Sequence, residues 1–214
     1  MRWDGVWHVA EGVAFSVIVI LYIWFRPLWW SWSLLIPLAL VAASFVWHSE
    51  TTASLGLSLK TAWSAIIAWR WWLLACLTPP VLLAWWQATP RHVVYRWFGY
   101  LAWCIVQQLL FQNMAYRRLR EGLGASWRTS AYAGVLFGAA HIPNPVLMPA
   151  TFLWGTVSTR LFEARRSVPV LGLCQALLSA LLYSVTPLAL NGQFRVGPGY
   201  WALLHRFAAY VFAS

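Results

Sequence analysis

The stretch WFGYLAWCIVQQLLFQNMAY at residues 97–116 carries no charge and is followed directly by a run of arginines that begins at Arg117. A helix needs about 20 predominantly apolar residues to cross the hydrocarbon core of a bilayer. The stretch is long enough, so it predicts a transmembrane helix. Amide side chains lie within it at membrane depth, where polar groups are costly unless they are used: Gln107, Gln108, Gln112 and Asn113.

The composition of the whole chain extends this prediction. Of 214 residues, 61% are hydrophobic and 9% are charged, whereas charged residues make up about 25% of an ordinary soluble domain. This balance excludes a disordered chain, a coiled coil and a disulfide scaffold. The three cysteines lie in apolar stretches and are interpreted as small core residues.

Cutting the chain at charges and prolines predicts an all-α polytopic membrane bundle of about eight transmembrane helices. We expect a single membrane domain over residues 1–214. The expected spans are 5–25, 28–47, 61–87, 97–116, two within 129–159, 167–187 and 200–214. The third span is expected to kink or break at Pro79-Pro80, and Pro143 and Pro145 divide the 129–159 stretch.

The distribution of the basic residues predicts the orientation, because cytoplasmic loops carry the excess of Lys and Arg. One predicted side holds Arg2, Lys60, Arg117, Arg118, Arg120, Arg128, Arg160, Arg165 and Arg166; the other holds Arg26, Arg91, Arg96 and Arg195. Both termini are therefore expected in the cytoplasm, with the protein in a bacterial inner membrane. The net charge of +10 is then a topology signal and does not indicate nucleic-acid binding.

The chain contains 18 tryptophans, which cluster at intervals of about one membrane crossing. Interfacial anchoring is the first interpretation, since indole rings favour the headgroup region. The alternative is a flat aromatic surface for a lipid, quinone, pigment or partner helix.

No carboxylate is expected at membrane depth. The acids lie at span ends or in loops and are interpreted as solvated or arginine-paired surface charges: Asp4, Glu11, Glu50, Glu121 and Glu163. The histidines outside the motifs described below show no partner at ligand spacing, so no metal site is predicted: His8, His48, His92 and His205. Ser126, in a Gly-x-Ser-x segment, is a nucleophile, a plain loop serine or a helix N-cap.

Further polar groups follow in the second half of the chain. Gly134 and Gly138 form a small-residue packing face that leads to Phe137 and His141, which lie one turn apart. Gln175 and Ser179 also lie one turn apart, on the span at 167–187.

The order of these pieces resembles the CPBP family, the CAAX prenyl protease and bacteriocin-processing intramembrane peptidases. That family carries Glu-Glu-x-x-x-Arg, Phe-x-x-x-His and His-x-x-x-Asn on successive helices. The equivalent positions here are Gln112, Asn113, Arg117, His141, Gln175 and Ser179. The resemblance covers residues 97–186 as a family-like core, with 1–96 as additional N-terminal spans, and implies an intramembrane peptidase scaffold.

The departures from the family pattern argue against its chemistry. A general base must accept a proton near working pH, and the amides of Gln112 and Asn113 cannot. The paired glutamates of the family are thus absent. The neutral set of Gln112, Asn113, His141, Gln175 and Ser179 is expected to form an uncharged network between helices, without the cost of buried charge.

Two functional hypotheses follow. The first is a catalytically degenerate member that acts as a binding or assembly subunit of a membrane complex, with membrane lipids and a membrane protein as partners. No obligatory cofactor is predicted, and a bound lipid, quinone or pigment fits this hypothesis. The second is an active intramembrane endopeptidase with an unusual site that uses His141 and amide groups as oxyanion donors.

Overall fold

The computed structural model describes residues 3–25, 35–86 and 91–213, and every regular element in these ranges is helical. The α-helices are α1 (Trp3–Phe25), α2 (Leu35–Trp47), α3 (Leu59–Trp86), α4 (Arg91–Leu110), α5 (Arg117–Leu123), α6 (Trp127–Ala139), α7 (Leu147–Ala164), α8 (Val168–Val185), α9 (Leu188–Asn191) and α10 (Pro198–Ala213). A π-helical segment, η3 (Phe111–Tyr116), joins α4 to α5, and a 3-10 turn, η4 (Gly192–Phe194), follows α9. The predicted all-α class is confirmed.

Two described helical stretches are long and apolar enough to cross a membrane, Gly5–Phe25 and Val168–Val185, and Leu38–Trp47 is a shorter apolar helix. Judged by length and composition, the described residues therefore contain fewer spans than the eight expected. One physical reason is visible in α6, whose 13 residues fall short of the roughly 20 that a perpendicular crossing needs.

The helix boundaries agree with the predicted ones at several breakers and differ at two. α1 ends at Phe25, before Arg26-Pro27, and α6 and α7 are separated around Pro143 and Pro145, as expected. A kink or a break was expected at Pro79-Pro80, and the break is wrong, because α3 continues through both prolines. In the turn before the prolines, Thr78 Oγ1 donates to the Leu74 carbonyl at 2.7 Å.

The predicted end of the fourth helix at the arginine run is also wrong. The backbone stays right-handed helical at Leu110 and Arg117, so α4, η3 and α5 follow one another without a break. The arginines can remain helical because α5 packs against α1 and its cations find carboxylates, as described below.

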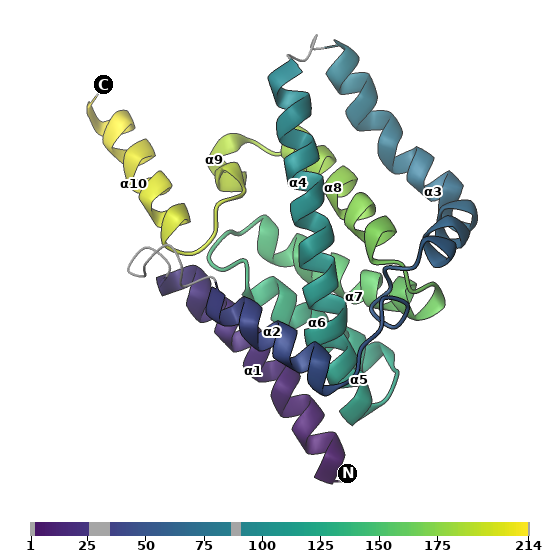
Figure 1. Ribbon diagram of the computed structural model, residues 1–214. Helices are drawn as coiled ribbons and strands as arrows, with labels where there is room; N and C mark the ends of the chain where they lie inside the picture. Colours follow the sequence, from purple (N-terminus) through teal and green to yellow (C-terminus); the bar gives the residue numbers. More distant parts are fainter. Residues whose placement is uncertain (1–2, 26–34, 87–90, 214) are drawn as a thin grey trace.

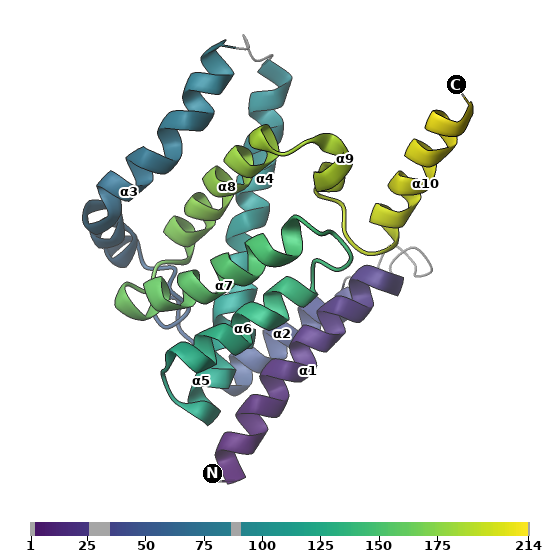
Figure 2. The same ribbon diagram turned by 180° about the vertical axis from the view of Figure 1, so that it is seen from behind.

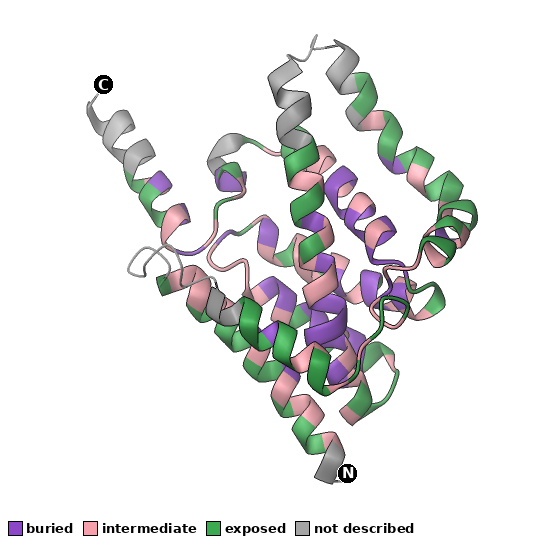
Figure 3. Ribbon diagram, viewed as in Figure 1, coloured by how far each residue is buried: buried purple, intermediate pink, exposed green. Residues whose placement is uncertain are grey.

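Buried residues concentrate where η3 meets α6, α7 and α8 (Figure 3). α6 packs on α7, α4 on α8, α1 on α5, and α3 on α8. α3 contacts the rest of the bundle along a limited surface (Figure 1). Figures 1 and 2 show that α1 begins at one end of the molecule and α10 runs toward the other.

The turn between α6 and α7 is held against the segment that follows α8. Asn144 is fully buried, and its Nδ2 donates to the Asn191 carbonyl at 2.7 Å and to the Arg195 carbonyl at 3.1 Å. Its Oδ1 accepts from the backbone N–H of Leu147, the first residue of α7, at 2.9 Å. The Asn144 side chain thus holds the turn that contains His141 against the segment that follows α8.

The predicted small-residue face on α6 is confirmed. A Cβ on Gly134 would meet Thr156 Oγ1 and would lie 2.7 Å from the Phe152 carbonyl, both on α7. The absence of side chains thus allows the two helix backbones to approach closely.

We expect Gly134→Ala to destabilise the protein by about 1–3 kcal/mol, because the added methyl group overpacks the contact of α6 with α7. Gly99→Ala is the matched control, since nothing lies within 4 Å of its Cβ position. Thermal unfolding in detergent measures the difference. Equal unfolding temperatures for the two variants would contradict close packing at Gly134.

Candidate functional site

The first family-equivalent motif lies in the π segment η3, whose residues are all buried. Gln112 is 0% exposed and Asn113 is 1% exposed. A π segment changes which side chains of a helix face a given direction, and such segments are frequent at functional sites. The two amides that replace the family's glutamates are therefore enclosed by protein.

Gln112 uses its amide nitrogen to join three elements. Its Nε2 donates to Gln108 Oε1 at 2.9 Å and to Ser158 Oγ on α7 at 3.1 Å. Its own Oε1 is buried without a hydrogen-bond partner in the structure described. The hydrogen bonds at residue 112 thus require a hydrogen-bond donor, which an amide supplies and a carboxylate lacks.

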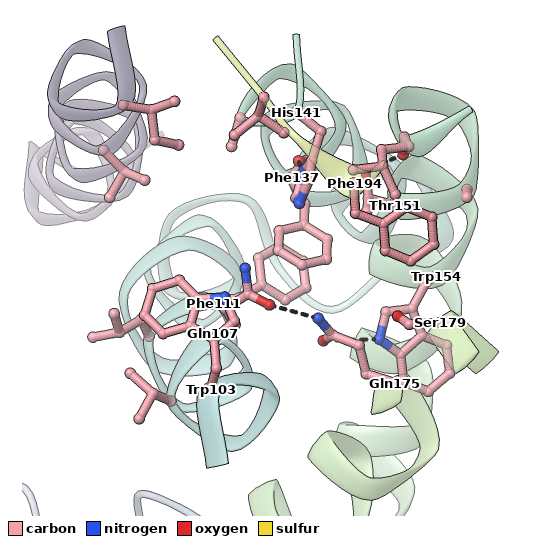
Figure 4. Close-up of a pocket in the computed structure, with 18 of the residues that line it drawn as sticks. Trp103, Gln107, Phe111, Phe137, His141, Thr151, Trp154, Gln175, Ser179 and Phe194 are labelled. Atoms are coloured by element: carbon pink, nitrogen blue, oxygen red, sulfur yellow. Dashed lines mark hydrogen bonds between the residues drawn. The ribbon is translucent and has the colours of Figure 1, made fainter. Parts of the chain in front are cut away.

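Gln175 on α8 is the centre of the remaining bonds (Figure 4). Its Oε1 accepts from Gln108 Nε2 at 2.6 Å and from Trp154 Nε1 at 3.3 Å. Its Nε2 donates to Gln107 Oε1 at 2.7 Å. Neutral side chains from α4, α7, α8 and η3 are therefore connected through one amide network.

The membership of this network differs from the sequence prediction. Asn113 donates instead to the Leu109 and Leu55 carbonyls, at 2.9 and 3.2 Å. His141 Nδ1–H donates to the Phe137 carbonyl at 2.7 Å. In place of the expected members Asn113, His141 and Ser179, the network includes Gln107, Gln108, Ser158 and Trp154. Sequence spacing could not place the Asn113 side chain, because the π segment alters the register there.

A partly open cavity of about 1230 Å³ lies beside the network, and no Asp, Glu, Lys or Arg lines it. Its wall is mainly apolar and includes the indoles of Trp72, Trp103 and Trp154. Figure 4 labels some of the polar residues in its lining: Gln107, His141, Thr151, Gln175 and Ser179. The cavity is thus uncharged throughout its described lining.

The family-equivalent positions divide into two groups. His141, Gln175 and Ser179 line the cavity. Gln112 and Asn113 do not line it, and Arg117 forms ion pairs elsewhere, with Glu50 at 2.6 Å and Glu121 at 3.1 Å. The residues that replace the family's glutamates do not fit a metal ion there, because amides are poor ligands compared with carboxylates and these two do not converge with His141.

The cavity residues that the motif comparison missed are Gln107, Trp103 and Trp154. Gln107 was visible as an amide at membrane depth, and both tryptophans stood in apolar stretches. Their shared position depends on the packing of α4 and α7 against α8, for which the sequence of a single helix carries no signal.

A buried cation lies outside this cavity, on α5. The Arg118 side chain is 1% exposed and pairs with Glu121 at 2.9 Å, Glu11 at 3.3 Å and Glu50 at 3.5 Å. Burial alone would raise the pKa of Glu121, but its hydrogen bond with Arg118 and the nearby cations hold that pKa below its usual value. The Glu50 side chain is only 2% exposed, so its interpretation as a surface charge is wrong. The pairing of Glu50 with Arg117 and Arg118 is as expected.

The structure also shows where Ser126, the cysteines and two of the remaining histidines lie. Ser126 is the N-cap of α6, since its side chain accepts from the Thr129 N–H at 3.1 Å. The cysteines are free and buried, as expected for small core residues. His8 and His48 do have partners: their ligand atoms and those of Glu11 lie within 4.8 Å of one another. The prediction that they lack partners at ligand spacing is wrong.

The fold and the site together define an all-helical membrane protein with an uncharged cavity between its helices. The family model of the type II CAAX prenyl endopeptidase Rce1-like proteins matches residues 89–181. This part of the chain is therefore similar to the Rce1-like proteins, in agreement with the resemblance that the motif order indicates. Neither the curated proteins nor the solved structures gave a significant match.

Proposed function

We propose that the protein is a catalytically degenerate CPBP-family member that binds an elongated apolar molecule in the uncharged cavity. It serves as a binding or assembly subunit of a membrane complex. The observation that carries this proposal is a cavity of about 1230 Å³ whose described lining holds no charged side chain.

The chemistry of the lining supports binding over hydrolysis. Water activation needs a group that takes a proton, and the amides of Gln107 and Gln175 instead bond to each other at 2.7 Å. His141 is the only imidazole of the described lining, and no carboxylate there orients it. Its Nδ1–H is used by the Phe137 carbonyl, which leaves Nε2 as a hydrogen-bond acceptor.

The same lining defines the ligand class. Apolar walls favour an isoprenoid or acyl chain, and the absence of charge favours a small neutral head group. A hydroxyl group could donate to His141 Nε2, whereas a charged head group would lie without a counter-ion. A neutral lipid, a quinone or an isoprenoid pigment meets these requirements.

Binding of radiolabelled farnesol to the protein in nanodiscs tests the proposal. Val106 lines the cavity and is 40% exposed, so Val106→Trp should fill the cavity without disturbing the core. We expect this variant to lose saturable binding. Val135→Trp is the matched control, because Val135 is 55% exposed and does not line the cavity. Equal binding by the two variants would overturn the assignment of the site.

A farnesylated CAAX peptide distinguishes the alternative hypothesis. The protein should leave this peptide intact. Cleavage that is lost in His141→Ala would instead establish an active endopeptidase with an unusual site.

A further inference from the structure

A second polar cluster lies at the opposite end of α1 from the α6–α7 turn and has no part in the cavity. His8 and Glu11 are three residues apart on α1, and His48 follows the last residue of α2. The ligand atoms of these three side chains lie within 4.8 Å of one another, and the two imidazole rings have centroids 5.7 Å apart. Imidazole nitrogen and carboxylate oxygen are the donors that zinc takes in protein sites.

Neighbouring side chains fix the orientation of each donor. Glu11 Oε1 accepts from Ser44 Oγ at 2.6 Å, while its Oε2 lies 3.1 Å from His48 Nε2. His8 Nδ1 lies 3.4 Å from Glu121 Oε2. A histidine that ligates a metal commonly presents its other ring nitrogen to a carboxylate in this way. Glu121 would therefore orient His8 and leave Nε2 for a ligand.

The charge balance of the cluster favours a bound cation. The carboxylates of Glu11, Glu50 and Glu121 face two guanidinium groups, those of Arg117 and Arg118. With neutral imidazoles, one negative charge is left over among these described residues. Arg118 also remains paired with Glu121 at 2.9 Å if Glu11 turns toward a metal ion.

The cluster is accessible to an ion. It lines a cleft of about 510 Å³ whose other walls include Trp7, Ala43 and Trp47. The side chains of Glu11 and His48 are 29% and 21% exposed, and that of His8 is 29% exposed. Side chains with this exposure can rotate to shorten their separations to those of a bound metal.

We propose that His8, Glu11 and His48 bind a divalent transition-metal ion, with Zn²⁺ as the best match to two nitrogens and one carboxylate oxygen. A water molecule completes a tetrahedral site. The ion connects α1 to the end of α2 and, through Glu121, to α5. The site is separate from the uncharged cavity.

Titration of metal-free protein in detergent with ZnCl₂, followed by calorimetry, tests this site. We expect one Zn²⁺ per chain, and absorption bands of tetrahedral coordination when Co²⁺ replaces it. The His8→Ala/His48→Ala double variant should lose both signals. His205→Ala is the matched control, since His205 is exposed and outside the cluster, and it should bind as the wild type does.

If Glu121 positions His8, its substitution should weaken Zn²⁺ binding without abolishing it. Glu121→Gln should weaken Zn²⁺ binding about 10- to 100-fold while leaving the stoichiometry unchanged. Zn²⁺ should also raise the unfolding temperature of the wild type and of His205→Ala but not of the double variant, whose fold is checked by circular dichroism. Absence of stoichiometric binding to the wild type, or equal binding by the folded double variant, would overturn the site.

Discussion

Replacing Arg118 with alanine is expected to destabilise the protein by about 3–5 kcal/mol, the usual cost of removing one partner from a buried ion pair. The Arg118 side chain is 1% exposed and lies against three carboxylates, of which Glu50 is itself 2% exposed. Without the guanidinium group these carboxylates repel one another in a poorly hydrated environment. Arg117 stays beside Glu50 at 2.6 Å but supplies only one charge.

Denaturant unfolding in detergent measures this loss for Arg118→Ala. Arg166→Ala is the control, because Arg166 is exposed and joins none of the ion pairs described. A change of less than about 1 kcal/mol in both variants, as is typical of surface pairs, would show that the cluster contributes little to the contact of α1 with α5.

The second large effect is expected from Gln112→Glu, which restores one glutamate of the family pattern. We expect a loss of about 2–5 kcal/mol at neutral pH, since the change removes two donated hydrogen bonds and places a carboxylate in a fully buried position. The new oxygen would face Gln108 Oε1, which lies 2.9 Å from the present amide nitrogen. We also expect no gain of peptidase activity, because residue 112 does not line the cavity.

Gln112→Met separates the two causes of this loss. It removes the same hydrogen bonds but adds no charge, so it should cost less than Gln112→Glu. A Gln112→Glu variant that is as stable as the wild type and cleaves a prenylated peptide would show that the site tolerates the family's chemistry.

The class of the protein and most helix boundaries could be predicted from the sequence. Charges and prolines are local signals, and they place the end of α1 at Phe25 and the interruption around Pro143. The glycine face at Gly134 was equally visible, because close packing of helices needs small residues at helical spacing. The continuous course of α3 was not visible, since a proline inside a helical stretch usually ends or kinks the helix.

The candidate site was predicted only in part, for physical reasons. His141, Gln175 and Ser179 keep the register of regular helices and line the cavity. Gln112 and Asn113 lie in a π segment, which changes the direction of their side chains. The cluster of Arg118 with Glu11 and Glu50 joins residues far apart in the chain, and spacing along one helix gives no sign of such contacts.

The tryptophan excess also gains a more specific interpretation. Trp72, Trp103 and Trp154 line the cavity, which agrees with the alternative of an aromatic surface for an apolar molecule. Trp7, Trp47 and Trp71 are more than 70% exposed and fit the interfacial anchoring that amphipathic indoles provide. We propose that the two interpretations apply to different tryptophans.

Native mass spectrometry of the protein released from its own membrane tests the central claim most directly. The wild type and Val135→Trp should carry one neutral apolar molecule per chain, and Val106→Trp should be released without it. A wild-type protein that appears as the bare polypeptide, or a molecule that Val106→Trp retains to the same extent, would contradict an apolar-ligand site in the cavity.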